Sequence, residues 1–321
     1  MDNNENITLE MENNIINISL QNPDHICNCD INDKIIEHGP LCPGAPRPNL
    51  PCDASLSIVE IVPKLVFIVP YRDREQQYKF FSNHMKMILE DIPIDDYKFL
   101  YLHQNDNREF NRGAMKNIGF LYVKNKYPEH YKDITLVFND IDTMPYVKNF
   151  LNYDTKKNYV KHFYGYNFTL GGIVSIKAED FENISGFPNF WSWGYEDNLL
   201  QKRVLDARLI IDRKQFYPIM DKNIFQMKDG LKRLVNRSEF DRFLGETNEG
   251  WQSIQELEYE FDEKSSFINV TRFNTGIEPN SRNNTIHDLR DGNDPFDMAK
   301  IKTIMTYSKK NKARPTMQMR L

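Results

Sequence analysis

The sequence predicts an α/β protein in which a twisted, mostly parallel β-sheet carries helices on both faces. The prediction rests on two observations. Short runs rich in β-branched and aromatic residues recur along the chain, and between them lie longer stretches with apolar residues at helical spacing. Strands that alternate with helices are joined by crossover connections, which favour parallel pairing. A chain of 321 residues is also long enough to bury the core that such a sheet needs.

The strands and helices are expected to follow one another from residue 64 onward. Strands are expected over residues 64–70, 97–104, 134–142, 171–177 and 208–212. Helices are expected over residues 72–91, 111–127, 178–184 and 196–207. The pattern weakens from residue 213, after which only 258–261 and 266–273 have the composition of strands. Residues 61–275 are therefore predicted to form one domain.

Both ends of the chain differ in composition from this domain. Residues 1–60 hold ten acidic and two basic side chains, several prolines and all four cysteines, which predicts an acidic N-terminal extension. Its cysteines could bind zinc or remain reduced thiols. Residues 276–321 are predicted to be a basic C-terminal tail, because residues 298–321 hold seven basic and no acidic side chains. The net charge of −5 excludes a chain that binds nucleic acid through an overall positive surface.

No stretch of the sequence has the pattern of a transmembrane segment. The longest apolar run, residues 65–69, is far shorter than the roughly 20 residues that a spanning helix needs. The first residues lack the positive charge and the apolar stretch of a signal peptide. We therefore expect a protein that is cytoplasmic or otherwise soluble inside the cell.

Two carboxylates follow the apolar strand expected at residues 134–138. Asp140 and Asp142 stand one residue apart, at the point where the strand ends. In open α/β sheets, ligands bind beyond the carboxyl ends of the strands. Carboxylate oxygens at that place would suit Mg²⁺ or Mn²⁺, and such a cation can neutralise a departing diphosphate. On these residues alone, a solvated acidic turn remains the alternative.

A second candidate site lies in residues 186–198. Trp191 and Trp193 are followed there by the acidic pair Glu196–Asp197 at the start of an expected helix. Aromatic faces stack on sugar rings, and a carboxylate beside them can accept a proton from a hydroxyl group. One of the two tryptophans could equally belong to the core, since alternate residues of an extended chain point to opposite sides. The acidic pair could equally be a helix start that acids stabilise.

These segments together resemble the β-1,4-galactosyltransferase family. The resemblance is carried, in order along the chain, by FIVPYRDREQQ (67–77), FNRGAMKNIGF (110–120), VFNDIDTMP (137–145) and the stretch from LGGIVSIK to GYEDN (170–198). It implies a GT-A type nucleotide-sugar-binding fold. It further implies metal-dependent, inverting transfer of galactose or N-acetylgalactosamine from a UDP-sugar to a sugar hydroxyl of a glycan or glycoconjugate acceptor, with a β linkage formed.

The resemblance also assigns roles to individual residues. The donor site would be lined by residues from all four motifs, namely Pro70, Tyr71, Arg72, Arg74, Phe110, Arg112, Asp140, Thr169, Gly171, Gly172 and Trp193. Trp193 would lie on a flexible loop that closes over the donor sugar. Asp197 would be the general base, with Glu196 beside it facing the acceptor. Asp142 would bind the divalent cation, Mn²⁺ or Mg²⁺.

The chain departs from the family pattern at several of these positions. The family's later metal ligands have no clean counterpart, and Met227 and Asp229 are the donors available in that region. Met227 could instead be a core methionine. Thr169 stands where many galactosyl members have a tyrosine that crowds the 2-substituent of the donor, so UDP-GalNAc is expected to serve at least as well as UDP-Gal. Because of these departures, a catalytically inactive sugar-nucleotide- or glycan-binding relative of the same fold remains the alternative.

Overall fold

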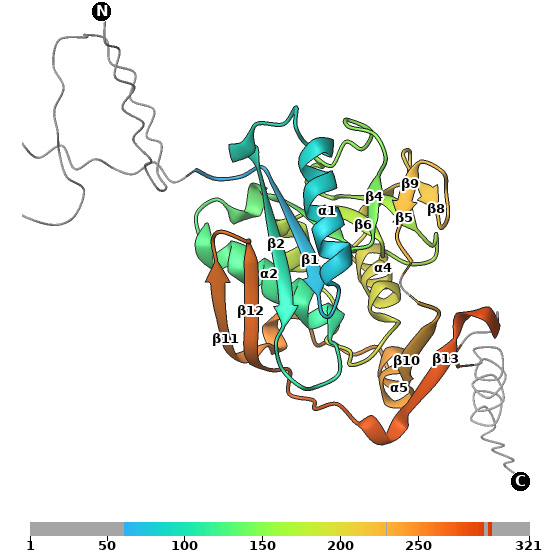
Figure 1. The fold of residues 1–321 in the computed structure, drawn as a ribbon. Helices are drawn as coiled ribbons and strands as arrows, with labels where there is room; N and C mark the ends of the chain where they lie inside the picture. Colours follow the sequence, from blue (N-terminus) through green and yellow to red (C-terminus); the bar gives the residue numbers. More distant parts are fainter. Residues whose placement is uncertain (1–60, 229, 292–294, 297–321) are drawn as a thin grey trace, which may run out of the picture. The chain divides into compact units, whose positions relative to one another are not determined.

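The computed structural model describes residues 61–228, 230–291 and 295–296, and a nine-stranded sheet runs through them (Figure 1). The strand order is β11 (Gln255–Asp262), β12 (Phe267–Asn274), β2 (Tyr97–Gln104), β1 (Leu65–Tyr71), β3 (Thr135–Asn139), β6 (Ile173–Lys177), β5 (Tyr159–Gly165) and β7 (Ile210–Asp212), with β8 (Tyr217–Pro218) also beside β5. Strand β1 pairs in parallel with β2 and β3, and β12 with β2, whereas β6 is antiparallel to both of its neighbours. The sheet is therefore mixed but mostly parallel, as the sequence predicted.

Helices cover both faces of this sheet, because the central strands are apolar on both sides. Alternate residues of β1 separate into two cores: Phe67 packs toward Phe81 of α1 (Glu75–Ile88), and Ile68 packs toward Ile118 of α2 (Arg112–Lys126). Helices α3 (Ala178–Asn183) and α4 (Glu196–Asp206) lie on the same side as α2. Helix α2 approaches β1 closely, since a Cβ on Gly119 would stand only 2.6 Å from Ile68 Cγ2.

Smaller elements surround the sheet, and most of them were not expected from the sequence. Strand β4 (Thr143–Pro145) pairs with β9 (Ile224–Gln226), and β10 (Lys232–Asn236) pairs with β13 (Asn284–Asp288). Helix α5 (Arg237–Leu244) follows β10. Short 3₁₀ helices lie at Ile94–Asp96, Tyr131–Asp133, Trp251–Ser253, Ser281–Asn283 and Leu289–Asp291.

The predicted tail begins too early, because residues after 275 pack onto the domain. Strand β13 is paired along its whole length with β10. The indole N–H of Trp191 donates a hydrogen bond of 2.7 Å to the carbonyl of Ile277. The predicted N-terminal extension, with its cysteines, lies outside the described residues, and so does the lysine-rich end of the chain. None of the helices in the described part has the length and apolar character that a membrane span requires.

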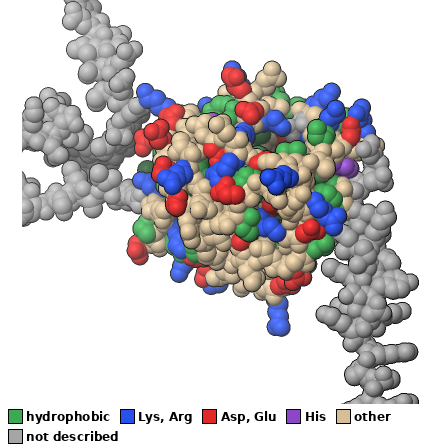
Figure 2. Space-filling model, turned by 90° about the horizontal axis from the view of Figure 1, so that it is seen from below, with side chains coloured by type: hydrophobic (Ala, Val, Ile, Leu, Met, Phe, Trp, Pro, Cys, Tyr) green, Lys and Arg blue, Asp and Glu red, His purple; other side chains and the backbone are tan. Residues whose placement is uncertain are grey.

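The carboxyl ends of β1, β2 and β3 meet at one edge of the sheet. Strand β6 starts at this same edge because it runs antiparallel to β3, with Asn139 opposite Ile173. The amide of Asp140 donates to the carbonyl of Gly172 at 3.1 Å, so the residues after β3 and before β6 are neighbours. Figure 2 looks onto the side of the molecule toward which β1 and β2 point, and basic and acidic side chains intermingle there.

Candidate active site

The loop before α4 contains residues with left-handed backbone conformation. Its two tryptophans lie in different surroundings. Ser192, Gly194 and Tyr195 have φ values of 74°, 106° and 71°. Trp191 points inward, is 1% exposed and stacks on Phe273 with ring centroids 5.6 Å apart. Trp193 is only half-buried, and its backbone N–H donates to the carbonyl of Leu234 at 2.8 Å. One tryptophan is thus a core residue, whereas the other is partly exposed, with the guanidinium carbon of Arg233 5.8 Å from its ring centroid.

Arg112 joins the two acidic motifs. Its Nη2 donates to Asp140 Oδ1 at 2.5 Å, and its Nε lies 3.7 Å from Glu196 Oε1. The arginine is the first residue of α2, where the Asn111 side chain caps the helix by accepting from the amide of Ala114 at 2.8 Å. Residues that are 56 positions apart in the sequence therefore meet at a single guanidinium group, whose planar fork suits two carboxylates.

Asp197 lies against the glycine turn that precedes β6. Its carboxylate Oδ1 accepts from Lys116 Nζ at 2.9 Å, and its backbone carbonyl accepts from the amide of Leu170 at 3.0 Å. A Cβ on Gly171 would stand 2.3 Å from Asp197 Oδ2, so the close approach requires glycine at this position. The structure therefore brings together Asp140, Gly171, Glu196 and Asp197.

The charges of this cluster depend on one another. Burial, together with the charge of Asp197, raises the pKa of Glu196, against the opposing effect of Arg112 and Lys116. Burial by itself would lower the pKa of Arg112, but the charges of Asp140, Glu196 and Asp197 outweigh it and raise that pKa. Arg112 therefore stays protonated, and it holds Glu196 in place next to the more exposed Asp197.

His162 supports the glycine turn from behind, and sequence reasoning did not identify it. Its Nε2 lies 3.0 Å from the carbonyl of Tyr164 and 3.1 Å from that of Gly171, and its Nδ1 accepts from Arg213 Nε at 3.0 Å. This pattern assigns the proton to Nε2. Burial and the charge of Arg213 lower the pKa of His162 to about 4, so the ring is neutral at physiological pH.

Asp142 and Met227 are adjacent in space. Asp142 directly precedes β4 and Met227 directly follows β9, so the pairing of these two strands brings the residues together. The amide of Met227 donates to the carbonyl of Asp142 at 2.7 Å. The described residues contain no group of three His, Cys, Asp or Glu side chains that could hold a metal ion, and Asp229 lies outside them. The carboxylate of Asp142 is a ligand type that Mn²⁺ and Mg²⁺ prefer, whereas the thioether of Met227 is a softer ligand.

The other predicted donor residues lie at the ends of β1 and β2. Pro70 is buried and paired with Leu102, whereas Tyr71 packs edge-to-face on His103 with ring centroids 5.2 Å apart. Arg72 is held by the loop after β2, since it donates to the carbonyls of Arg108 at 2.5 Å and Asp106 at 2.6 Å.

The remaining three predicted donor-site residues, Arg74, Phe110 and Thr169, lie in different surroundings. Arg74 directly precedes α1, and its carbonyl accepts from the amide of Tyr78 at 2.8 Å, whereas Phe110 packs on the core beside α2. Thr169 is buried, and its hydroxyl lies 3.4 Å from the carbonyl of Tyr166.

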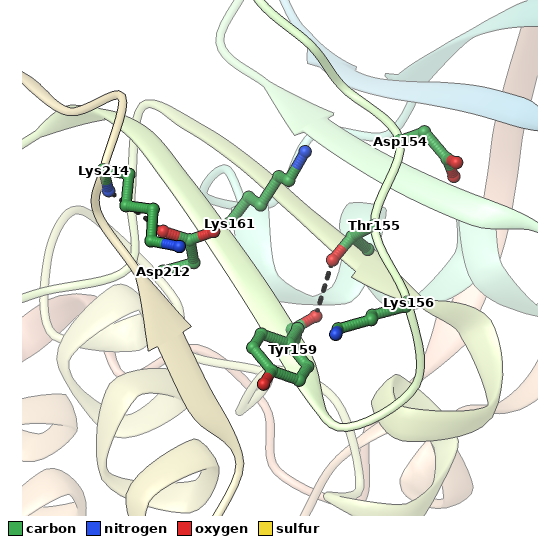
Figure 3. Close-up of a pocket in the computed structure, with 7 residues that line it drawn as sticks. All are labelled: Asp154, Thr155, Lys156, Tyr159, Lys161, Asp212 and Lys214. Atoms are coloured by element: carbon green, nitrogen blue, oxygen red, sulfur yellow. Dashed lines mark hydrogen bonds between the residues drawn. The ribbon is translucent and has the colours of Figure 1, made fainter.

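A separate cavity lies at the opposite end of β5. It has a volume of about 340 Å³ and is lined by Asp154, Thr155, Lys156, Tyr159, Lys161, Asp212 and Lys214 (Figure 3). Tyr159 begins β5, whereas Gly165 ends it beside Gly171, where a Cβ on Gly165 would stand 2.9 Å from the carbonyl of Gly171. None of the predicted site residues lines this cavity, so it is distinct from the acidic cluster.

Two family models match adjoining stretches of the chain. The N-terminal region of glycosyl transferase group 7 matches residues 57–154, and a model described as the N-terminal domain of galactosyltransferase matches residues 153–228. Together they cover more than half of the chain.

Curated relatives match a similar region. Xylosylprotein 4-β-galactosyltransferase of Caenorhabditis elegans is 29% identical over 180 residues, 53% of this chain and 60% of that protein. β-1,4-Galactosyltransferase 5 of Sus scrofa is 30% identical over 166 residues, 47% of this chain and 40% of that protein. The chain thus spans about half the length of such relatives.

A solved structure shares the fold. The catalytic domain of Drosophila β-1,4-galactosyltransferase 7, in complex with xylobiose, superposes with a TM-score of 0.56 at 20% identity, covering 69% of this chain and 97% of that one. This likeness confirms the GT-A fold that the sequence motifs implied. The matched family models and the shared fold lead to one assignment: the chain belongs to the galactosyltransferase family of glycosyltransferase group 7, which includes the β-1,4-galactosyltransferases.

Proposed function

We propose that the protein is a metal-dependent, inverting glycosyltransferase. It transfers galactose or N-acetylgalactosamine from a UDP-sugar to a sugar hydroxyl of an acceptor and forms a β linkage. One observation supports this proposal above the others: Arg112 joins Asp140 to Glu196, while Asp197 lies against Gly171. A group suited to the donor side and a group suited to the acceptor side are therefore neighbours in one site.

Asp197 is the general base in this proposal. Its Oδ1 is occupied by Lys116, and its side chain is 20% exposed, so Oδ2 is free to accept the proton of an acceptor hydroxyl. The hydroxyl oxygen then forms a bond to the anomeric carbon of the donor, and the bond from that carbon to the diphosphate breaks. UDP leaves with the bonding electron pair from the opposite face, which inverts the configuration. A positioned base contributes about 10²–10⁴-fold to such a rate.

The donor side is formed by the residues after β3 and before β6. Asp140 and the Gly171–Gly172 turn are neighbours there, and a sugar nucleotide could approach the glycine backbone closely. Asp142 and Met227 would hold a divalent cation, which when bound neutralises negative charge on the leaving diphosphate. Trp193 is half-buried and stands before Gly194, so it could close over the donor and exclude water.

Thr169 supports a donor with a bulky 2-substituent. It lies two residues before Gly171, and its short side chain turns back toward the carbonyl of Tyr166. A tyrosine at this position would add a large ring beside the glycine turn. We therefore infer that UDP-GalNAc is used at least as well as UDP-Gal.

The test is release of UDP from a panel of donors and acceptors. UDP-Gal, UDP-GalNAc and UDP-Glc would each be offered with Mn²⁺, Mg²⁺ or chelator. Xylosides come first among the acceptors, because the related Drosophila structure contains xylobiose. We expect cation-dependent turnover and a product with β configuration by NMR. Donor binding without turnover across the panel would favour the inactive relative, and a large preference for UDP-Gal would refute the donor inference alone.

A further inference from the structure

Lys116 is a buried cation directly beside the proposed base. Its side chain is 2% exposed, and its Nζ lies 2.9 Å from Asp197 Oδ1. The ammonium group also lies over the ring of Phe187, 4.2 Å from its centroid. A buried charge is costly unless it is paired, so the position of this lysine depends on the carboxylate that it meets.

Helix geometry explains why Lys116 reaches Asp197. Arg112 and Lys116 are four residues apart on α2, so they project from one face of the helix. Glu196 and Asp197 are successive residues in the first turn of α4. The two cations divide between the two acids: Arg112 bridges Asp140 and Glu196, whereas Lys116 contacts Asp197.

We propose that Lys116 is a positioning residue for Asp197, an inference that rests on the proposed function. By donating to Oδ1, Lys116 fixes the carboxylate so that Oδ2 faces the substrate beside Gly171. The other charged or titratable groups around Asp197 are Arg112 of α2, Glu196 of α4, Asp140 after β3, and His162 of β5, which is neutral.

The experiment compares Lys116→Met, which removes the charge and the donor, with Lys116→Gln, which removes the charge but keeps a hydrogen-bond donor on a shorter side chain. The matched control is Lys124→Met, because Lys124 lies two turns further along α2, pairs with Glu182 at 2.5 Å and covers the ring of Trp251 at 4.6 Å, away from the site. Each variant would be assayed for UDP release from pH 5 to pH 9, after donor binding has shown that it is folded.

We expect Lys116→Met to lower kcat at neutral pH at least tenfold and to leave the KM for the donor unchanged. Lys116→Gln, which keeps a hydrogen-bond donor, should recover part of the lost kcat, and Lys124→Met should resemble wild type. Lys116→Met with the wild-type kcat would overturn the inference and leave the proposed function intact. An inactive wild type would overturn both.

A stability measurement keeps the inference testable if neither Lys116 variant binds donor. Asp197→Asn leaves the ammonium group buried without its anion, so its melting temperature should fall well below that of wild type. Adding Lys116→Met to this variant should restore most of the loss. An Asp197→Asn variant as stable as wild type would overturn the inference, because Lys116 would then not depend on the carboxylate.

Discussion

Replacing Arg112 by methionine is the sharpest test of how the site is held together. The change removes the guanidinium that bridges Asp140 and Glu196, so the 5%-exposed side chain of Glu196 loses its ion pair. At an effective dielectric constant of about 20, unit charges 3.7 Å apart interact by about 4 kcal/mol. Breaking a buried pair typically costs about 3–5 kcal/mol, and the 20% exposure of the Arg112 side chain lowers the expectation to about 3 kcal/mol.

Urea unfolding, followed by tryptophan fluorescence, would measure this loss. The second variant is Arg112→Met combined with Glu196→Gln, which should recover much of the stability because the unpaired carboxylate is gone. The control is Arg237→Met, whose exposed pair with Asp241 should contribute below about 0.5 kcal/mol. If Arg112→Met lies within about 1 kcal/mol of wild type at pH 8, the bridge is well solvated and the reasoning is refuted.

Three further predictions concern the cation, the glycine turn and a buried acid near the loop. Asp142→Asn should abolish cation-dependent donor binding, whereas Asp197→Asn should keep donor binding and lose about 10²–10⁴-fold in turnover. Calorimetric titration with and without Mn²⁺, together with a UDP-release assay, distinguishes the two variants. Near-normal turnover of the Asp197 variant would contradict the assignment of Asp197 as the base. Gly171→Ala should lower turnover, because the added Cβ would stand 2.3 Å from Asp197 Oδ2. The control Gly245→Ala should leave turnover unchanged, because its added Cβ would have its nearest neighbour 3.4 Å away. Equal turnover rates in the two variants would argue against a tight turn at Gly171. Burial raises the pKa of Glu239 from 4.5 to about 7, so the folded state binds the proton more tightly, and the free energy of unfolding falls as the pH rises from about 4.5 through 7. Glu239→Gln should remove up to about 3 kcal/mol of this decline, measured by urea unfolding at pH 5 and pH 8. If wild type and variant lost the same stability between these pH values, the shift would be disproved.

The central strands and helices could be predicted because the spacing of their apolar residues matches either the period of a strand or that of a helix. Strand β2 was predicted at its observed bounds, and β1, α2 and α4 were within a residue or two. Strand β5 was not recognised, although Val160, Phe163 and Tyr164 are buried in it. Strand β13 could not be recognised, since it has a single apolar residue, Ile286, and is held by backbone pairing with β10.

The candidate site was predictable where the ends of strands position it. Asp140 and Gly172 meet because β3 and β6 pair. Lys116 was missed for a physical reason: a lysine in a helix normally extends its charge into water. Its burial follows from the packing of α2 against the first turn of α4, which a single sequence does not reveal. The signal that could have found it is its four-residue spacing from Arg112.

The hydrogen bond from Trp191 to Ile277 has a consequence for how the loop before α4 can move. The indole is hydrogen-bonded to a segment that follows the last strand of the main sheet, so the position of Trp191 is fixed at this end of the loop. The next stretch is held as well, since the backbone N–H of Trp193 donates to the carbonyl of Leu234 at 2.8 Å. A chain ended at residue 275 would lose the anchor while keeping every residue of the acidic cluster. The segment after β12 therefore helps to hold the loop that carries Trp191.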